Sequence, residues 1–364
     1  MPPVDHVALN ACFLDPGVSG GPESYLVGLA PALAAARPAA RMSVLTTRRG
    51  AASLTAAGWT DWATVVAMPC DEGERVRRIS AEVLGIPAWV KRHRPTVLHN
   101  LASIGPPRRV AAAQVVTLHD LTFLRLATFG QATTAAMRWL SLGTARHSDR
   151  IITATEASLD EIVELGGVDR ADVDVVPHGR RPIEPVSAET VERVRAEHEL
   201  VGRRVVLNVA AKRPHKNQAV IVRAMAQLTA DAVLVLAGHA EPYADELRSI
   251  AAELGVEGRV RFLDYVTDAE LEALWTIADA AAFPTRGEGF GLPVIEAMDR
   301  GLPVACSRIP VLLEVSGGLA HTFDPDDPAE AAAAIDAALV DPTAGEAGRA
   351  HAQQFTWANA AEQT

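Results

Sequence analysis

The chain has 364 residues and a formal net charge of −11 at pH 7, because 45 Asp and Glu residues outnumber 34 Lys and Arg residues. This acidic balance argues against a protein that coats nucleic acid, since contact with phosphates requires a basic surface. Hydrophobic residues make up 49% of the sequence. That share is enough for a core in each of two domains, the usual division above roughly 250–300 residues, and it excludes a mostly disordered chain.

The cysteines and the N-terminus indicate a reducing compartment. Cys12, Cys70 and Cys306 are widely spaced, without a Cys-x-x-Cys pair, so we expect neither a disulfide framework nor a zinc site. The N-terminal segment lacks the basic and apolar regions of a signal peptide, and no run of about 18 apolar residues predicts a membrane span. We therefore expect a cytoplasmic protein.

The first half of the chain alternates short apolar runs with longer amphipathic segments. Such alternation predicts a parallel sheet with helices on both faces. Predicted strands cover residues 6–11, 42–46, 96–99, 114–118, 150–153 and 173–176, and predicted helices cover 22–36, 74–93, 131–147 and 155–165. The stretch from Pro177 to Pro185 interrupts the pattern and predicts a linker.

The second half repeats this pattern and predicts a second domain of the same α/β class. Predicted strands cover residues 204–209, 232–237, 259–263, 280–283 and 303–306, and predicted helices cover 187–199, 217–229, 241–254, 268–277, 292–300, 308–315 and 328–339. We place the N-terminal domain at 1–182 and the C-terminal domain at 183–345, followed by a terminal helix over 346–364.

The loop after the strand 280–283 is the strongest candidate site, since ligands of open parallel sheets bind beyond the carboxyl ends of the strands. A glycine-rich loop leads here into a helix, whose N-terminal amides attract anions such as a diphosphate. Glu288 in the loop and Glu296 in the helix supply carboxylates for sugar and ribose hydroxyls, and we take Glu288 as a catalytic candidate. The ligand-binding candidates of this segment are Gly289, Phe290, Gly291, Leu292, Pro293 and Glu296.

Three further loops follow predicted strands. Gly20 and Gly21 open a helix after the first strand, where the lack of a side chain lets a phosphate or an acceptor approach the backbone. His119, a catalytic candidate, and Asp120 follow the strand 114–118. Lys216 follows the strand 204–209 and is a catalytic candidate, because its charge would stabilise a leaving diphosphate. Lys212 and Arg213 in the same segment are further candidates for binding the diphosphate ligand, and the sequence leaves open which of them contacts phosphate.

The segment Phe283-Pro-Thr-Arg-Gly-Glu-Gly-Phe-Gly-Leu-Pro-Val-Ile-Glu296 resembles the E-x7-E motif of the retaining glycosyltransferases of family 4, which have the GT-B fold. The resemblance covers nearly the whole chain in the expected order. It includes Ser19–Tyr25 (glycine loop), Thr117–Phe123 (central histidine), Ala210–Asn217 (phosphate-binding segment), Thr267–Trp275, Glu296–Val304 and Pro310–Gly317. The chain departs from the pattern at Ala210 and Ala211, where many members carry an arginine, and at Asp264, where glycine is frequent.

The resemblance implies two Rossmann-like parallel-sheet domains that face each other across a cleft, with the terminal helix crossing back to the N-terminal domain. It implies that the C-terminal domain binds a nucleotide sugar, with backbone groups near Val266 at the nucleobase, and that the N-terminal domain presents the acceptor. The HDLTFL segment and the Lys216-Asn217 pair resemble the mannosyltransferase-like branch. We therefore expect GDP-mannose as the first donor, with UDP- or dTDP-sugars as alternatives.

We expect the reaction to need no metal and no cofactor besides the nucleotide-sugar substrate. The pairs Asp172/Asp174 and Asp324/Asp326 are typical of capping or surface groups rather than of a metal-binding Asp-x-Asp loop. The acceptor is expected to be a hydroxyl of a saccharide, a lipid-linked saccharide or a natural product. Basic clusters such as 91–94 predict solvated helix faces, with weak docking on the inner membrane surface as the alternative.

Three other functions were weighed against this one. A nucleotide-sugar 2-epimerase shares the two-domain fold, but the E-x7-E segment disfavours it. A nicotinamide dehydrogenase requires a G-x-G-x-x-G loop, which the stretch from Gly17 to Gly21 does not supply. A non-catalytic protein of the same fold would bind the donor without transferring its sugar.

Overall fold

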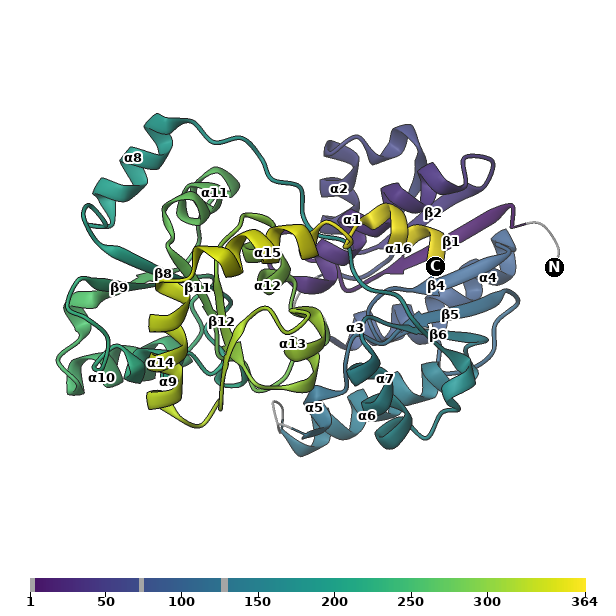
Figure 1. The fold of residues 1–364 in the computed structure, drawn as a ribbon. Helices are drawn as coiled ribbons and strands as arrows, with labels where there is room; N and C mark the ends of the chain where they lie inside the picture. The colour runs from purple at the N-terminus through teal and green to yellow at the C-terminus, as the bar shows by residue number, and fades with distance from the viewer. Residues whose placement is uncertain (1–3, 72–74, 126–129) are drawn as a thin grey trace. The chain divides into compact units, whose positions relative to one another are not determined.

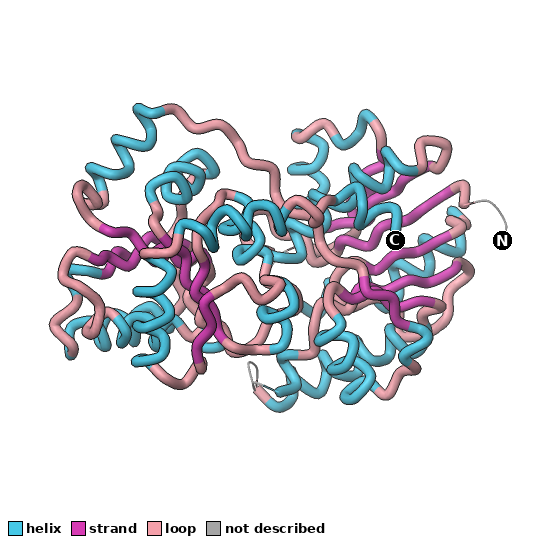
Figure 2. Tube along the Cα trace, viewed as in Figure 1, coloured by secondary structure: helices cyan, strands magenta, loops and turns pink. Residues whose placement is uncertain are grey.

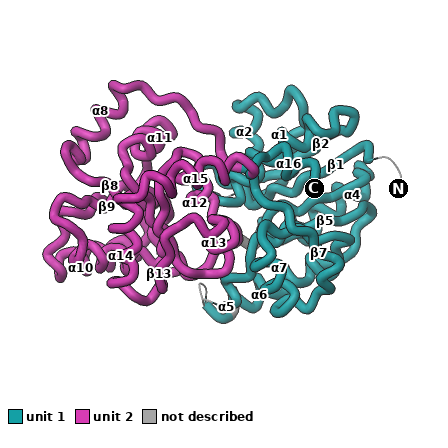
Figure 3. The backbone as a smooth tube through the Cα atoms, viewed as in Figure 1, with its two compact units in different colours: residues 1–179, 355–364 teal, residues 180–354 magenta. Residues whose placement is uncertain are grey.

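The computed structural model describes residues 4–71, 75–125 and 130–364, and it divides the chain into two compact units (Figure 3). Unit 1 comprises Met1–Gly179 and Phe355–Thr364, and unit 2 comprises Arg180–Gln354. Arg180 belongs to unit 2 because its Nε lies 2.9 Å from Asp299 Oδ1 and its Nη2 donates to Gln353 Oε1 at 2.7 Å. The chain therefore passes between the units at residues 179–180 and 354–355. The sequence analysis placed these two boundaries at residues 182–183 and 345–346.

Unit 1 is built on a seven-stranded parallel sheet in the order β3-β2-β1-β4-β5-β6-β7 (Figures 1 and 2). Its strands are β1 (His6–Ala11), β2 (Arg41–Thr46), β3 (Ala63–Ala67), β4 (Val97–Asn100), β5 (Ala113–Thr117), β6 (Arg150–Thr153) and β7 (Val173–Val175). Its α-helices are α1 (Gly21–Ala36), α2 (Arg48–Ala56), α3 (Arg75–Ser80), α4 (Ile86–His93), α5 (Thr122–Arg125), α6 (Gln131–His147), α7 (Glu156–Gly166) and α16 (Trp357–Gln363).

The sequence analysis missed three elements of unit 1, namely α2, β3 and the short helix α5. Helix α2 begins because Thr47 caps it, with its Oγ1 accepting a hydrogen bond from Gly50 N at 2.9 Å. Its buried Leu54 packs in the same cluster as Ala63 of β3, the edge strand that follows. The predicted helix 74–93 is α3, a π-helical turn (Ala81–Gly85) and α4, and its first predicted residue lies outside the described residues.

Unit 2 is built on a six-stranded parallel sheet in the order β10-β9-β8-β11-β12-β13. Its strands are β8 (Arg204–Val209), β9 (Ala232–Ala237), β10 (Val260–Leu263), β11 (Ala280–Phe283), β12 (Val304–Ser307) and β13 (His321–Phe323). Its α-helices are α8 (Ala188–Glu197), α9 (Gln218–Ala224), α10 (Tyr243–Glu253), α11 (Asp268–Ile277), α12 (Leu292–Asp299), α13 (Pro310–Val315), α14 (Pro328–Leu339) and α15 (Pro342–Ala352). The prediction of two parallel-sheet α/β domains is confirmed, and only the short β13 lacks a predicted counterpart in this unit.

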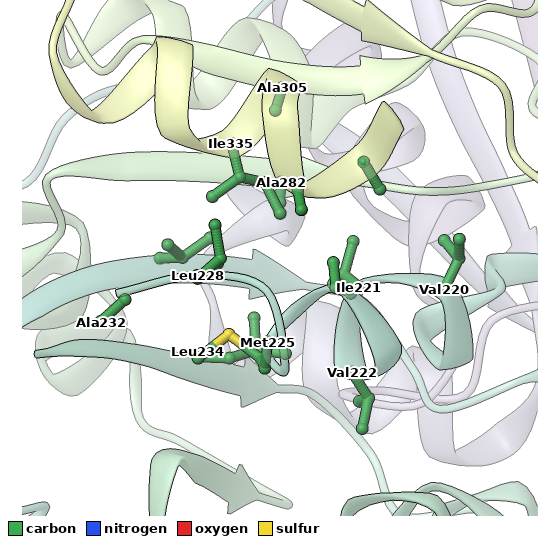
Figure 4. Packing of buried hydrophobic residues seen from close by; sticks show 14 of the residues in the cluster. Val220, Ile221, Val222, Met225, Leu228, Ala232, Leu234, Ala282, Ala305 and Ile335 are labelled. Carbon is green, nitrogen blue, oxygen red and sulfur yellow. The ribbon is translucent and has the colours of Figure 1, made fainter. Parts of the chain in front are cut away.

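The core of unit 2 explains why its strands were easy to predict. All six residues of β9 are buried, and the hydrophobic cluster around them includes Ile221 of α9 and Ile335 of α14 (Figure 4). A strand buried on both faces is a continuous apolar run, so the sequence marks its ends clearly. Strands β8, β9 and β11 accordingly have the predicted bounds.

The predicted terminal helix 346–364 is instead two helices, α15 in unit 2 and α16 in unit 1. Thr356 caps α16, with its Oγ1 accepting a hydrogen bond from Asn359 N at 3.1 Å, so a new helix begins there. Ala360 and Ala361 of α16 are buried in the same cluster as Leu26 and Leu29 of α1. The chain therefore does return to the N-terminal domain. None of the helices in the described ranges is both long and apolar enough to cross a bilayer.

Candidate active site

Asn217 fixes the loop that carries Lys216. It has a left-handed backbone conformation with φ of 56°, between a 3₁₀ turn (Pro214–Lys216) and α9. Its side-chain amide donates hydrogen bonds to Pro284 O at 3.0 Å and to Pro325 O at 2.8 Å. Asn is among the few residues that tolerate this conformation, and its side chain is used here to hold two neighbouring loops.

The loop after β11 is joined to the same turn. Thr285 Oγ1 donates to His215 O at 3.2 Å, and Arg286 N donates to the same carbonyl at 2.9 Å. As a result Lys216 Nζ lies 2.5 Å from Glu288 Oε1, and the two side chains are only 24% and 20% exposed. Two of the three predicted catalytic residues, 72 positions apart in sequence, are thus an ion pair at the carboxyl edge of one sheet.

The start of α12 has the backbone expected of an anion site. Gly291 has φ of +93°, and a Cβ there would lie 2.7 Å from Leu312 Cδ2, so this position requires glycine. Gly289 and Phe290 before it are buried. Pro293 lies in the first turn of α12, where a missing amide hydrogen costs nothing.

Glu296 is half-buried in the second turn of α12. Burial raises the pKa of its carboxyl group, and the nearby Glu272 raises it further, whereas the positive charges of Arg300 and Arg181 lower it. A half-buried carboxyl group of this kind is suited to accepting hydrogen bonds from uncharged hydroxyl groups.

Lys212 is placed differently from the other candidates, since its side chain is 0% exposed. Its ammonium donates to Gly238 O at 2.5 Å and Leu263 O at 2.8 Å, and it lies 3.6 Å from Asp264 Oδ1. Burial lowers the pKa of Lys212, against the opposing effect of Asp264. The side chain therefore ties together the ends of β9 and β10, which shapes the loop that contains Val266.

Arg213 is half-exposed and forms hydrogen bonds to Glu241 Oε1 from its Nε at 3.0 Å and its Nη2 at 2.8 Å. Val266 is half-buried in the loop after β10. The structure thus separates the two basic residues that the sequence left undecided. Arg213 keeps its side chain at the surface, whereas the Lys212 ammonium is occupied inside the unit.

In unit 1, Gly20 and Gly21 are exposed at the start of α1. Gly20 has φ of +62°, and a Cβ at either position would meet nothing within 4 Å. The open space agrees with a backbone that a ligand can approach, and the positive φ explains why glycine is needed at the first of the two.

His119 lies directly beyond β5, also at the carboxyl edge of its sheet. Its Nε2 is 2.9 Å from Leu101 O, and since a carbonyl oxygen only accepts, Nε2 carries the proton. Nδ1 is then an acceptor, without a hydrogen-bond partner among the described residues. Burial lowers the pKa of His119, which favours this neutral form. Asp120 uses its carboxylate locally, accepting a hydrogen bond from Thr122 N at 2.8 Å.

Family comparisons match both units of the chain. Residues 190–355 match the profile of "Glycosyl transferases group 1", and residues 19–182 match "Glycosyltransferase Family 4". The chain belongs to the family 4 glycosyltransferases of the GT-B fold.

Similar proteins agree with this membership. The chain is 29% identical to the O-antigen chain mannosyltransferase B of Escherichia coli over 288 residues, which cover 76% of the chain and 75% of that protein. It is 32% identical to the D-inositol 3-phosphate glycosyltransferase of Mycolicibacterium gilvum over 269 residues, covering 69% of the chain but only 59% of that relative's length.

Solved structures show the same fold. Anabaena HepE in complex with UDP and glucose aligns over 99% of the chain and 98% of its own, with a TM-score of 0.76 and 19% identity. Sucrose-phosphate synthase from Thermosynechococcus elongatus aligns over 99% and 97%, with a TM-score of 0.78 and 20% identity. At these identities the likeness concerns the GT-B fold.

Sequence reasoning on this family 4 glycosyltransferase missed the hydrogen bonds that position the candidate loops. Asn217, Thr285 and the Lys212 ammonium act through backbone carbonyls of distant loops. No spacing within one segment reveals such bonds. The one available signal is the type of residue, since Asn is favoured where the backbone is left-handed.

We expect Lys212→Met to lower the free energy of unfolding by about 2–4 kcal/mol, because two buried carbonyls and a nearby carboxylate lose their donor. Arg213→Met is the matched control, and its exposed ion pair should contribute less than about 1 kcal/mol. Urea unfolding followed by circular dichroism measures both. Equal losses in the two variants would contradict the structural role of Lys212.

Proposed function

We propose that this family 4 glycosyltransferase is a retaining, metal-independent enzyme that transfers mannose from GDP-mannose to a hydroxyl group of an acceptor. The observation that carries the proposal is the Lys216–Glu288 pair, held at the carboxyl edge of the unit 2 sheet in the loops that precede α9 and α12. This arrangement offers a cation and helix-terminal amides to a diphosphate, and a carboxylate to the sugar attached to it.

In this proposal Lys216 and the first amides of α12 stabilise the charge that builds on the leaving diphosphate. Among the described residues no three His, Cys, Asp or Glu side chains are grouped as metal ligands, which supports a role for Lys216 in place of a cation from solution. Glu288 accepts hydrogen bonds from sugar hydroxyls, and Glu296, eight positions later, accepts them from the ribose.

The bond changes need no protein nucleophile. The bond between the anomeric carbon and the diphosphate oxygen breaks, and the acceptor oxygen forms its bond to the same face of that carbon. The acceptor proton passes to the departing diphosphate, which lies on the same face and is made basic by its negative charge. Configuration at the anomeric carbon is thereby retained.

His119 takes part as a hydrogen-bond acceptor. With Nε2 donating to Leu101 O, its Nδ1 lone pair is directed at a substrate hydroxyl and cannot act as a proton donor. Gly20 and Gly21 provide exposed backbone at the same edge of the unit 1 sheet. We assign this edge to the acceptor and to the hydroxyl groups of the transferred sugar.

Asp264 supports a guanine nucleotide. It follows β10 two residues before Val266, and its carboxylate is half-exposed beside the Lys212 ammonium. The edge of guanine presents two adjacent N–H donors, N1–H and N2–H, which a carboxylate can accept together. Uracil presents one N–H between two carbonyl oxygens, which a carboxylate repels.

The relatives support mannose and leave the acceptor broad. The first is named a mannosyltransferase and the second a D-inositol 3-phosphate glycosyltransferase, so we propose as acceptor a hydroxyl of a saccharide or polyol, free or lipid-linked. The exposed side chains of Lys91, Arg92 and Arg94 at the end of α4 support weak association with an anionic membrane surface.

We expect transfer from GDP-mannose to proceed in the presence of EDTA and to give an α-linked product, the configuration of the donor. The enzyme is incubated with GDP-mannose and a panel of mannosides and inositol phosphates, and the anomeric carbon of the product is assigned by NMR. A β-linked product would contradict retention. Complete loss of turnover in EDTA, restored by Mg²⁺ or Mn²⁺, would contradict metal independence.

We expect Asp264→Asn to weaken GDP binding by roughly tenfold while leaving UDP binding unchanged or improved, because the amide no longer accepts two donors with a full charge. Isothermal titration calorimetry with both nucleotides measures the change. Asp245→Asn on α10 is the matched control, since it removes the same charge from another loop-proximal position of unit 2. Tighter binding of UDP than GDP by the unmodified protein would overturn the guanine assignment.

A further inference from the structure

The candidate histidine of unit 1 belongs to a cluster of four aromatic rings, and the other three lie outside the candidate site residues of the sequence analysis. The four rings are those of Tyr25 of α1, His119 beyond β5, His178 beyond β7 and Trp357, the first residue of α16. Tyr25 is 1% exposed and His178 is 5% exposed. The cluster thus joins both segments of unit 1, the N-terminal 179 residues and the returning C-terminus.

Tyr25 and His178 hold the His119 ring directly. The Tyr25 ring meets it edge to face at 5.0 Å between centroids, and the His178 ring does so at 5.3 Å. Tyr25 is itself oriented by a 3.1 Å hydrogen bond between its hydroxyl and Thr117 Oγ1, on the strand that precedes His119. Together with the bond from Nε2 to Leu101 O, these contacts determine where Nδ1 points.

Trp357 closes the opposite side of the cluster. Its ring lies 5.9 Å from Tyr25 and 6.0 Å from His178, nearly parallel to the latter at 25°. Two glycines make room for it. A Cβ on Gly28 would lie 2.0 Å from Trp357 Cε2, and a Cβ on Gly179 would lie 2.3 Å from Trp357 N. The indole therefore lies in a socket that requires glycine at positions 28 and 179, because any side chain there would clash with Trp357.

We propose that Trp357 is a positioning residue for His119, acting through Tyr25 and His178. The proposal rests on the role assigned to His119 under the proposed function. Trp357 touches no reacting group. It packs against the rings of Tyr25 and His178, and these two rings hold the His119 ring in place. Misplacement of a catalytic group by about 1 Å can cost up to roughly 100-fold in rate, so a remote ring of this kind affects turnover.

The surroundings of His119 give the proposal a second consequence. The titratable groups that face it are Asp120 in its own turn, Tyr25 from α1, His99 from β4 and His178 from the segment after β7. Burial lowers the pKa of His119, and Asp120 opposes that effect. Displacing the indole admits water, so the pKa of His119 should rise toward its ordinary value of 6.5. A protonated Nδ1 no longer accepts a hydrogen bond, and activity then falls as the pH falls through that value.

The sharpest test moves the indole without changing it. Gly28→Ala places a methyl group inside the Trp357 ring position, whereas Gly166→Ala, in the last turn of α7, meets no atom closer than 3.5 Å and is the matched control. We expect kcat with GDP-mannose to fall roughly 10- to 100-fold in Gly28→Ala, with KM changed by less than about threefold, and both to stay near the original values in Gly166→Ala.

A second pair of variants separates ring packing from general destabilisation. Trp357→Phe keeps an aromatic ring in the socket and should retain most of kcat, whereas Trp357→Leu should behave like Gly28→Ala. In the Trp357→Leu background Gly28→Ala should have no further effect, because the clash is gone. Thermal unfolding confirms that each variant is folded at the assay temperature.

A readout that needs no substrate completes the test. Histidine ¹⁵N and ¹³C NMR reports the tautomer and the pKa of His119 in each folded protein. We expect the original protein and Trp357→Phe to have a His119 pKa below 6.5, with the proton of the neutral ring on Nε2. In Gly28→Ala and Trp357→Leu its titration should move up toward pH 6.5. An unchanged His119 titration together with unchanged kcat in both of these variants would overturn the positioning role.

The outcome also distinguishes this proposal from the proposed function. If His119→Phe transfers mannose normally, the assignment of His119 to the site fails, whatever the NMR shows. If His119→Phe is inactive while Gly28→Ala and Trp357→Leu keep full kcat and an unchanged acid limb, the proposed function stands and the role of Trp357 is overturned.

Discussion

The geometry of the donor-side candidates depends on one residue, Asn217. Its left-handed backbone turns the chain from the loop after β8 into α9, and its side-chain amide donates hydrogen bonds to the carbonyls of Pro284 and Pro325. Together with the hydrogen bonds from Thr285 and Arg286 to His215 O, these bonds set the separation of the loops after β8 and β11, so that Lys216 and Glu288 meet. The parallel sheet brings the two loops to one edge, and Asn217 sets how they lie against each other.

In both units, polar side chains near the carboxyl edge of the sheet form hydrogen bonds to neighbouring segments. The Lys212 ammonium holds the ends of β9 and β10 in unit 2, where a charge is tolerated because carbonyls and a carboxylate surround it. In unit 1, burial lowers the pKa values of His99 and His119 and so favours their neutral forms. The Nε2 atom of His119 donates to Leu101 O, and that of His99 forms a hydrogen bond with Thr117 Oγ1. Under the proposed function, the first arrangement positions a loop on the nucleotide side, and the second leaves the Nδ1 lone pair of His119 to accept a hydrogen bond from a hydroxyl group.

The sequence predicted the elements that are buried on both faces and missed those that depend on local caps. Strands such as β9 are unbroken apolar runs with unambiguous ends, whereas the edge strand β3 and the capped helix α2 have weak patterns that tertiary packing decides. The terminal helix was predicted as one because its residues are all compatible with a helix. The Thr356 cap and the packing of the partly buried Trp357 against the core of unit 1 divide it.

The sequence predicted which segments form the candidate site, but not which contacts their side chains make. The loops around Gly20, His119, Lys216 and Glu288 all lie at the carboxyl edges of their sheets, as the strand–loop–helix pattern indicated. The sequence did not indicate which basic side chain of residues 212–216 faces outward. That difference depends on the carbonyls of Gly238 and Leu263, which belong to the ends of other strands. The ring cluster behind His119 was hidden for the same reason, since its members are up to about 330 residues apart.

The central claim is that Lys216, held against Glu288, is the cation of the diphosphate site. Calorimetric titration of GDP into the original protein, Lys216→Gln and Glu288→Gln tests it most directly, because it isolates the diphosphate from the chemical step. The account predicts roughly tenfold weaker binding or more for Lys216→Gln, and binding that is unchanged or tighter for Glu288→Gln, which removes a competing anion. Unaltered GDP affinity in Lys216→Gln would contradict the account and place the diphosphate at another loop.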